Sequence, residues 1–222
     1  MRRLVLPLIF GLLGAAVLAS LGVWQLQRLA WKEGVLADIS ARIAAAPDPI
    51  PSDPDPVADR YRPVTFEGRL AGAPIHVLAS RRGYGACYRV VAPMQAGGRV
   101  VMADLGFIAT EAADRPLPEG PYRVTGNLHW PDEVDGFTPA PDRDANIWFG
   151  RDVDAMAAAL GAEPVLVVVR TITPDAGTDP LPVGVEGIPN NHLGYAIQWF
   201  GLALVWLGMT LYLLWRIRRR TV

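Results

Sequence analysis

His192 is the residue of this sequence best suited to hold a ligand, because it begins a long apolar run and has aromatic neighbours at helical spacing. On a helix, His192, Tyr195 and Trp199 share one face, since they are separated by three and then four residues. The spacing therefore places an imidazole and two aromatic rings together at one end of a predicted helix.

A second aromatic and basic face lies near the end of the first apolar run. Trp24, Arg28 and Trp31 are spaced by four and three residues, and Gln25 and Lys32 lie beside them. Two antiparallel helices would bring this face to the same depth as the histidine at the start of the second run.

An imidazole, aromatic walls and one or two cations suit an amphiphilic ligand with an anionic edge. Haem is such a ligand, because histidine ligates its iron, indoles line the macrocycle, and Arg28 or Lys32 would pair with its propionates. The alternative is an aromatic belt with a snorkelling arginine, which spanning helices commonly show. The residues alone favour this second interpretation.

The rest of the sequence contains few residues in patterns typical of catalytic or metal sites. His76 and His129 fall in or near predicted strands, where a hydrogen-bonded structural role is commoner than catalysis. Cys87 is the only cysteine, and no HExxH or CxxCH pattern is present, which argues against structural zinc, a thiol copper carrier and c-type haem. Asp132, Glu133 and their neighbour at 135 are expected on a solvated loop. We therefore expect no enzyme.

Two uncharged apolar runs, Leu4–Leu26 and Leu193–Trp215, predict two transmembrane helices. Each has 23 residues, and at about 1.5 Å per residue this exceeds the ~30 Å hydrocarbon core. A signal peptide cleaved after Ala19 is the alternative for the first run, but the apolar stretch continues to Leu26 and favours a retained anchor.

The charges beside the runs predict the orientation. Arg2 and Arg3 precede the first run and four arginines follow the second, so both termini are expected in the cytoplasm. All 22 acidic residues lie between the runs with 15 of the 21 basic ones, which gives that segment a charge of −7. We expect an inner-membrane protein with a periplasmic, acidic domain and no nucleic-acid partner.

Between the runs, the pattern predicts an exported α+β domain dominated by antiparallel strands, as a sheet or a barrel. Turn residues such as Gly83 separate the strands expected at 62–70, 75–81, 88–93, 99–108 and 122–130, and a continuous apolar strand at 165–173 is expected to be central. Asp152 or Asp154 is expected to cap a helix at 155–160, which Gly161 ends. The predicted divisions are 1–3 as cytoplasmic N-terminus, 4–26 as first span, 27–60 as helix and Pro-rich connector, 61–191 as the β domain, 192–215 as second span and 216–222 as basic tail.

Several of these motifs resemble the Surfeit locus 1 family of cytochrome oxidase assembly proteins. The first-span sequence Leu21-Gly-Val-Trp-Gln-Leu-Gln-Arg28 is similar to that family's first span, and Pro189-Asn-Asn-His-Leu-Gly-Tyr-Ala-Ile-Gln-Trp-Phe-Gly-Leu-Ala203 is similar, more specifically, to its second. Tyr61-Arg-Pro-Val-Thr-Phe-Glu-Gly68 looks like its first strand. The family usually has an Asn-Arg-Gly-Trp-type sequence near the fourth strand, where this chain has Asp104-Leu-Gly-Phe107.

The resemblance implies an assembly factor for haem-copper terminal oxidases that binds haem a at the outer membrane face and promotes its insertion into subunit I. It makes His192 the candidate axial ligand and subunit I a partner, with haem A synthase as a possible donor. The pocket contacts from Trp24, Arg28, Tyr195 and Trp199, with Gln25 and Lys32 as further candidates, come from helical geometry. The alternative is a membrane-anchored scaffold that stabilises oxidase subunits without haem; a periplasmic hydrolase and copper delivery are disfavoured.

Overall fold

The computed structural model describes residues 2–81 and 85–219 of the chain. Its contacts divide the chain into two units, one formed by Met1–Asp38 with Val185–Val222 and the other by Ile39–Gly184. The turn predicted at Gly83, the N-terminal Met1 and the end of the predicted basic tail, 220–222, lie outside the described residues.

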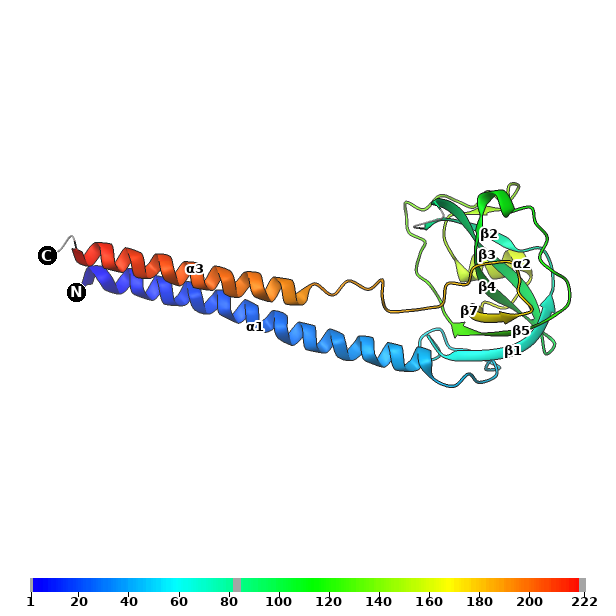
Figure 1. The fold of residues 1–222 in the computed structure, drawn as a ribbon, viewed down its shortest axis with the longest axis horizontal. Coiled ribbons are helices and arrows are strands. Elements are labelled where there is room, and N and C mark those ends of the chain that lie inside the picture. The colour runs from blue at the N-terminus through cyan, green and yellow to red at the C-terminus, as the bar shows by residue number, and fades with distance from the viewer. Residues whose placement is uncertain (1, 82–84, 220–222) are drawn as a thin grey trace. The chain divides into compact units, whose positions relative to one another are not determined.

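The first unit is formed by two helices, α1 (Arg2–Ala44) and α3 (His192–Arg219). Both are long and apolar enough to cross a membrane. The helix expected after the first span is continuous with it, because α1 runs unbroken as far as Ala44. The second begins at His192, and the two helices lie antiparallel, side by side (Figure 1).

Small residues allow these helices to approach closely. A Cβ atom at Gly11 would lie 2.1 Å from Cγ2 of Thr210, and one at Gly14 would lie 2.4 Å from Nε1 of Trp206. The same indole nitrogen donates a hydrogen bond to the Gly11 carbonyl at 3.0 Å. In a bilayer such packing and hydrogen bonding drive association, because lipid is as apolar as the side chains. The bulky residues of α3 therefore pack against the glycines of α1.

The second unit is a barrel. Its strands are β1 (Pro63–Leu70), β2 (Ile75–Arg81), β3 (Gly85–Ala96), β4 (Arg99–Ala109), β5 (Pro121–Leu128), β6 (Ile147–Trp148) and β7 (Leu166–Thr173). They are hydrogen-bonded in the order β1-β5-β7-β4-β3-β2-β6, and a further pairing of β1 with β3 closes the sheet. The closure depends on the length of β3, because its first half pairs with β2 and its end pairs with β1.

Most pairings are antiparallel, as the sequence predicts, but two are not. β4 pairs with β7 in parallel, and so does β2 with β6. The expectation of antiparallel hairpins fails for β4 and β7 because a long connection, which contains β5 and α2, allows the chain to return in the same direction. The central position predicted for β7 is confirmed, since it lies between β5 and β4.

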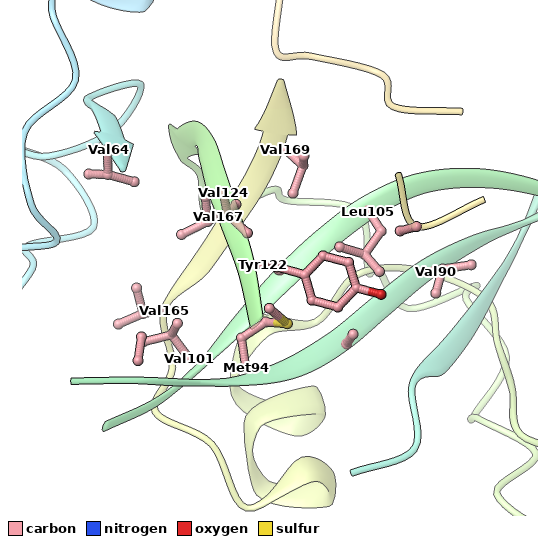
Figure 2. Packing of buried hydrophobic residues seen from close by; sticks show 14 of the residues in the cluster. Val64, Val90, Met94, Val101, Leu105, Tyr122, Val124, Val165, Val167 and Val169 are labelled. Atoms are coloured by element: carbon pink, nitrogen blue, oxygen red, sulfur yellow. The ribbon is translucent and has the colours of Figure 1, made fainter. Parts of the chain in front are cut away.

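Alternating side chains fill the barrel interior. Val101, Leu105 and Val167 belong to a cluster that also contains Tyr122 and Met94, all at most 2% exposed (Figure 2). The opposite faces of β4 and β7 are buried as well, because α2 (Val153–Leu160) packs there. Strands buried on both faces read as continuous apolar runs, which explains the sequence of β7.

The ends of α2 agree with the sequence prediction. The side chain of Asp152 accepts a hydrogen bond from the Ala155 amide at 3.0 Å and forms the N-cap. Gly161 follows the helix with a φ of 61°, a left-handed conformation that glycine adopts without steric cost. The short helix is therefore fixed at both ends by local sequence.

Candidate functional site

His192 is the first residue of α3, and its ring is oriented by α1. Its Nδ1 lies 2.8 Å from Oε1 of Gln25. In the neutral imidazole, with this amide oxygen as the acceptor, Nδ1 carries the proton and Nε2 keeps its lone pair. Metal-binding histidines are commonly oriented by such a hydrogen bond from the other ring nitrogen. The arrangement leaves Nε2 as the nitrogen able to ligate a metal.

Lys32 makes a second connection between the two helices. Its Nζ donates a hydrogen bond to the carbonyl of Pro189, in the segment that leads into α3. Gln25 and Lys32 are seven residues apart, so they lie on the same face of α1. This face therefore fixes both the start of α3 and the histidine that begins it.

The aromatic candidates lie on the surface of the helical unit. Trp24 and Trp31 are each 54% exposed, and Tyr195 is 50% exposed. The guanidinium of Arg28 lies 4.0 Å from the ring centroid of Trp31, a cation–π contact. Trp199 is partly buried. That these side chains form pocket walls around the histidine stays a prediction.

A polar hollow of about 420 Å³ lies at the start of α3. Asn190, Asn191 and Gln198 supply amide groups to it, and Tyr195 supplies a phenol. The Oδ1 atom of Asn190 is buried and has no hydrogen-bond partner among the described residues. The hollow is thus lined by hydrogen-bonding groups that lie next to His192 in the chain or follow it on α3.

The β unit contains a buried ion network that the sequence analysis missed. Asp104, 1% exposed, accepts hydrogen bonds from Nε of Arg89 at 2.5 Å and from Nη1 of Arg151 at 2.8 Å. Arg151 also binds Glu133, with Nε 3.0 Å from Oε2. The network joins β3 and β4 to the loop that precedes α2. The sequence feature that could have indicated this network is Asp104, a charged residue within an apolar strand, at the position where the chain differs from the Asn-Arg-Gly-Trp-type motif.

Burial and pairing set the protonation of this network. Burial lowers the pKa of Arg89 from its ordinary value, although the charge of Asp104 opposes this. Burial also opposes the charge of Arg151, but the hydrogen bonds that it donates to Glu133 and the charge of Asp104 outweigh burial and raise the pKa of Arg151. The pKa of Glu133 is lowered, because Arg151 outweighs the effect of burial. Arg151 and Glu133 therefore stabilise each other's charged forms.

The other titratable candidates have structural surroundings. His76 stacks on Tyr88 with ring centroids 5.4 Å apart, and His129 stacks on Tyr61 at 5.5 Å. Burial, followed by the charges of Arg151 and a neighbouring arginine, lowers the pKa of His129 to about 4. Cys87 is fully buried. Among the described residues, no group of three His, Cys, Asp or Glu side chains is placed to hold a metal ion.

Comparison with known proteins identifies related sequences over most of the chain. The SURF1 family model matches residues 12–204. Surfeit locus protein 1 of Homo sapiens is 28% identical over 209 residues, covering 81% of this chain and 68% of the relative. The same protein of Xenopus tropicalis is 28% identical, covering 82% and 67%, and a SURF1-like protein of Drosophila melanogaster is 30% identical, covering 86% and 72%.

Proposed function

This chain belongs to the SURF1 family, and on that premise we propose that it is an assembly factor for a haem-copper terminal oxidase. We further propose that it binds haem a at the outer membrane face and promotes its insertion into subunit I. The central β domain then serves to contact partner subunits. The protein has no catalytic role of its own in this proposal.

The observation that carries the haem proposal is the hydrogen bond between Gln25 and His192. It joins the two helices at the proposed site, and in the neutral imidazole it makes Nε2 the nitrogen without a proton, which is the state that ligates iron. The donor set fits haem: an imidazole, exposed indoles of Trp24 and Trp31, and the exposed guanidinium of Arg28.

Each residue has a separate role in this proposal. His192 would hold the haem iron through Nε2, and Gln25 orients its ring. Arg28 would pair with a propionate, and Tyr195 and Trp199 would supply aromatic contacts. The haem would supply an iron centre that the protein passes on. Lys32 orders the start of α3 through Pro189.

The proposed topology follows from the flanking charges. With both termini on the cytoplasmic side of an inner membrane, the site lies at the periplasmic boundary, and the β domain lies in the periplasm. This location would allow the protein to receive haem a from haem A synthase, and to deliver it to subunit I from the same bilayer.

Replacement of His192 by alanine in cells that need this protein for oxidase assembly tests the proposal. We expect subunit I to accumulate without haem a, measured by immunoblot and by the oxidase spectrum of the membranes. Tyr212→Phe, near the other end of α3, is the control and should assemble normally. A functional oxidase in the His192→Ala strain would favour the alternative, a scaffold that stabilises subunits without haem.

A further inference from the structure

Among the described residues of the β domain, the most exposed large apolar side chain belongs to Phe137, on the loop between β5 and β6. It is 95% exposed, and Val134 on the same loop is 43% exposed. Burial of such a side chain against a partner favours binding, because it removes a large apolar surface from water. The loop thus presents a hydrophobic anchor that nothing in its own unit covers among the described residues.

The turn that carries Phe137 is ordered by one carboxylate. Oδ1 of Asp135 accepts hydrogen bonds from the Phe137 amide at 2.9 Å and from the Thr138 amide at 3.0 Å. The Asp135 amide in turn donates to Oγ1 of Thr138 at 3.0 Å. A side chain held on such a turn loses little backbone freedom on binding, which favours affinity. The anchor is therefore preorganised.

The base of the same loop forms one wall of a hollow of about 630 Å³. Trp130 and Val134 give this wall apolar surface, and α2 and the Pro-rich connector form the other sides. Its carboxylates are Asp53, Asp132, Glu133, Asp152, Asp154 and Glu163, with Arg151 as its cation. The hollow thus combines apolar surface with a strongly negative border.

Much of this negative charge is not neutralised within the domain. Arg151 is already paired with Glu133 and Asp104. Asp132 and Asp154 are exposed and form no ion pair with any of the residues that the structure describes. These charges would repel an anionic lipid surface and attract a cationic polypeptide. Charge complementarity therefore selects a protein partner over the bilayer.

We propose that Phe137 and the acidic hollow beside it form a docking surface for a basic, partly apolar segment of a protein partner. Phe137 and Val134 bury against apolar side chains of that segment, and its Lys or Arg side chains face Asp132 and Asp154. The proposal rests on the proposed function in one respect: the segment belongs to an oxidase subunit. The docking surface belongs to the β unit, whereas His192 belongs to the helical unit.

Site-specific photocrosslinking tests the surface in the full-length, membrane-embedded protein. A benzoylphenylalanine at position 137 is activated in cells assembling the oxidase, and the crosslinked peptide is identified by mass spectrometry. We expect a peptide of an oxidase subunit that contains Lys or Arg. The crosslink should fall at least tenfold in Asp132→Asn/Asp154→Asn and persist in Asp114→Asn/Glu119→Gln, which removes two exposed carboxylates elsewhere in the domain.

The outcomes separate this surface from the proposed function. A crosslink only to lipid, or one that both double variants affect equally, overturns the docking surface even where the oxidase depends on the protein. A basic peptide from a protein unrelated to the oxidase, lost in Asp132→Asn/Asp154→Asn alone, supports the surface and contradicts oxidase assembly. Phe137→Ala gives a second measurement, with an expected loss of about 30-fold in affinity for the identified subunit.

Discussion

Asp104→Asn is expected to destabilise the β domain, because among the described residues it removes the only carboxylate that pairs with both Arg89 and the buried Arg151. The side chains of Arg89 and Arg151 are 12% and 8% exposed, and that of Asp104 is 0% exposed. Removal of one partner from a buried ion pair costs about 3–5 kcal/mol. Glu133 still pairs with Arg151, so we expect the lower end, about 3 kcal/mol.

Cys87 provides the assay. It is the only cysteine and is fully buried in β3, so its thiol reacts only when the strand separates from its neighbours. A loss of about 3 kcal/mol raises the open fraction, and with it the labelling rate of the full-length protein in detergent, by about 100-fold.

The control for this experiment is Glu67→Gln. It breaks the Arg123–Glu67 pair, whose side chains are 73% and 70% exposed. Exposed pairs contribute about 0–1 kcal/mol, so the labelling rate should change by less than about fivefold. Equal labelling rates in Asp104→Asn and Glu67→Gln would refute the reasoning, because the buried network would then contribute no more than an exposed pair.

Three further changes have defined outcomes. The lowered pKa of His129, about 4 in the folded protein against about 6.5 unfolded, means that stability is complete above pH 6.5 and declines toward pH 4. After allowance for its partial exposure the loss is at most about 2 kcal/mol, and urea midpoints between pH 7 and 5 should fall in the wild type and by a smaller amount in His129→Gln, where the lowered pKa of His76 still contributes. Gly14→Leu places a side chain against Trp206, so it should separate α1 from α3 and increase quenching of indole fluorescence by brominated lipid. Gly106→Ala adds a Cβ 2.2 Å from the Asp179 carbonyl oxygen at a φ of 101°, and should raise thiol labelling through a loss of at least about 2 kcal/mol.

Two other glycines supply matched controls. Gly208 on α3 and Gly136 on the loop that precedes β6 both face open space where a Cβ would lie. Gly208→Leu should leave lipid quenching unchanged, and Gly136→Ala should leave thiol labelling unchanged. An effect of either control as large as that of its partner would remove close packing as the explanation.

The elements of the fold could be predicted because their signals are local. The hairpin turn at Gly97 and Gly98, the cap at Asp152 and the helix stop at Gly161 are each encoded within a few residues, and all are present. Closure of the barrel could not be predicted, because it depends on β3 pairing with different strands along its two halves. β6 was missed because a strand of two residues, Ile147–Trp148, has no periodicity.

The bulge in β4 was also beyond the sequence. Val90 lies opposite Gly106 and Val91 opposite Asp104, so Leu105 is the extra residue. Leu105 remains in the core, and its neighbour Asp104 pairs with the two arginines. Such a network joins residues from distant parts of the chain, and only the folded structure shows which charges meet.

The faces of the membrane helices were predicted only in part. Helical spacing placed Trp24 and Arg28 on one face of α1, with Gln25 and Lys32 beside that face. Spacing shows which residues share a face, but it does not show which face contacts the second helix. The glycines of α1 determine the contacting face, because Trp206 and Thr210 of α3 pack against them. As a result, Gln25 and Lys32 contact the end of α3.

The visible spectrum of the detergent-purified protein, from cells that make haem a, tests the central claim most directly. We expect a stoichiometric Soret band and α band in the wild type, loss of both in His192→Ala, and a weakened or shifted spectrum in Gln25→Leu, because the ring loses its orienting hydrogen bond. A colourless wild-type protein, in cells whose oxidase still depends on it, would contradict haem binding and support the scaffold.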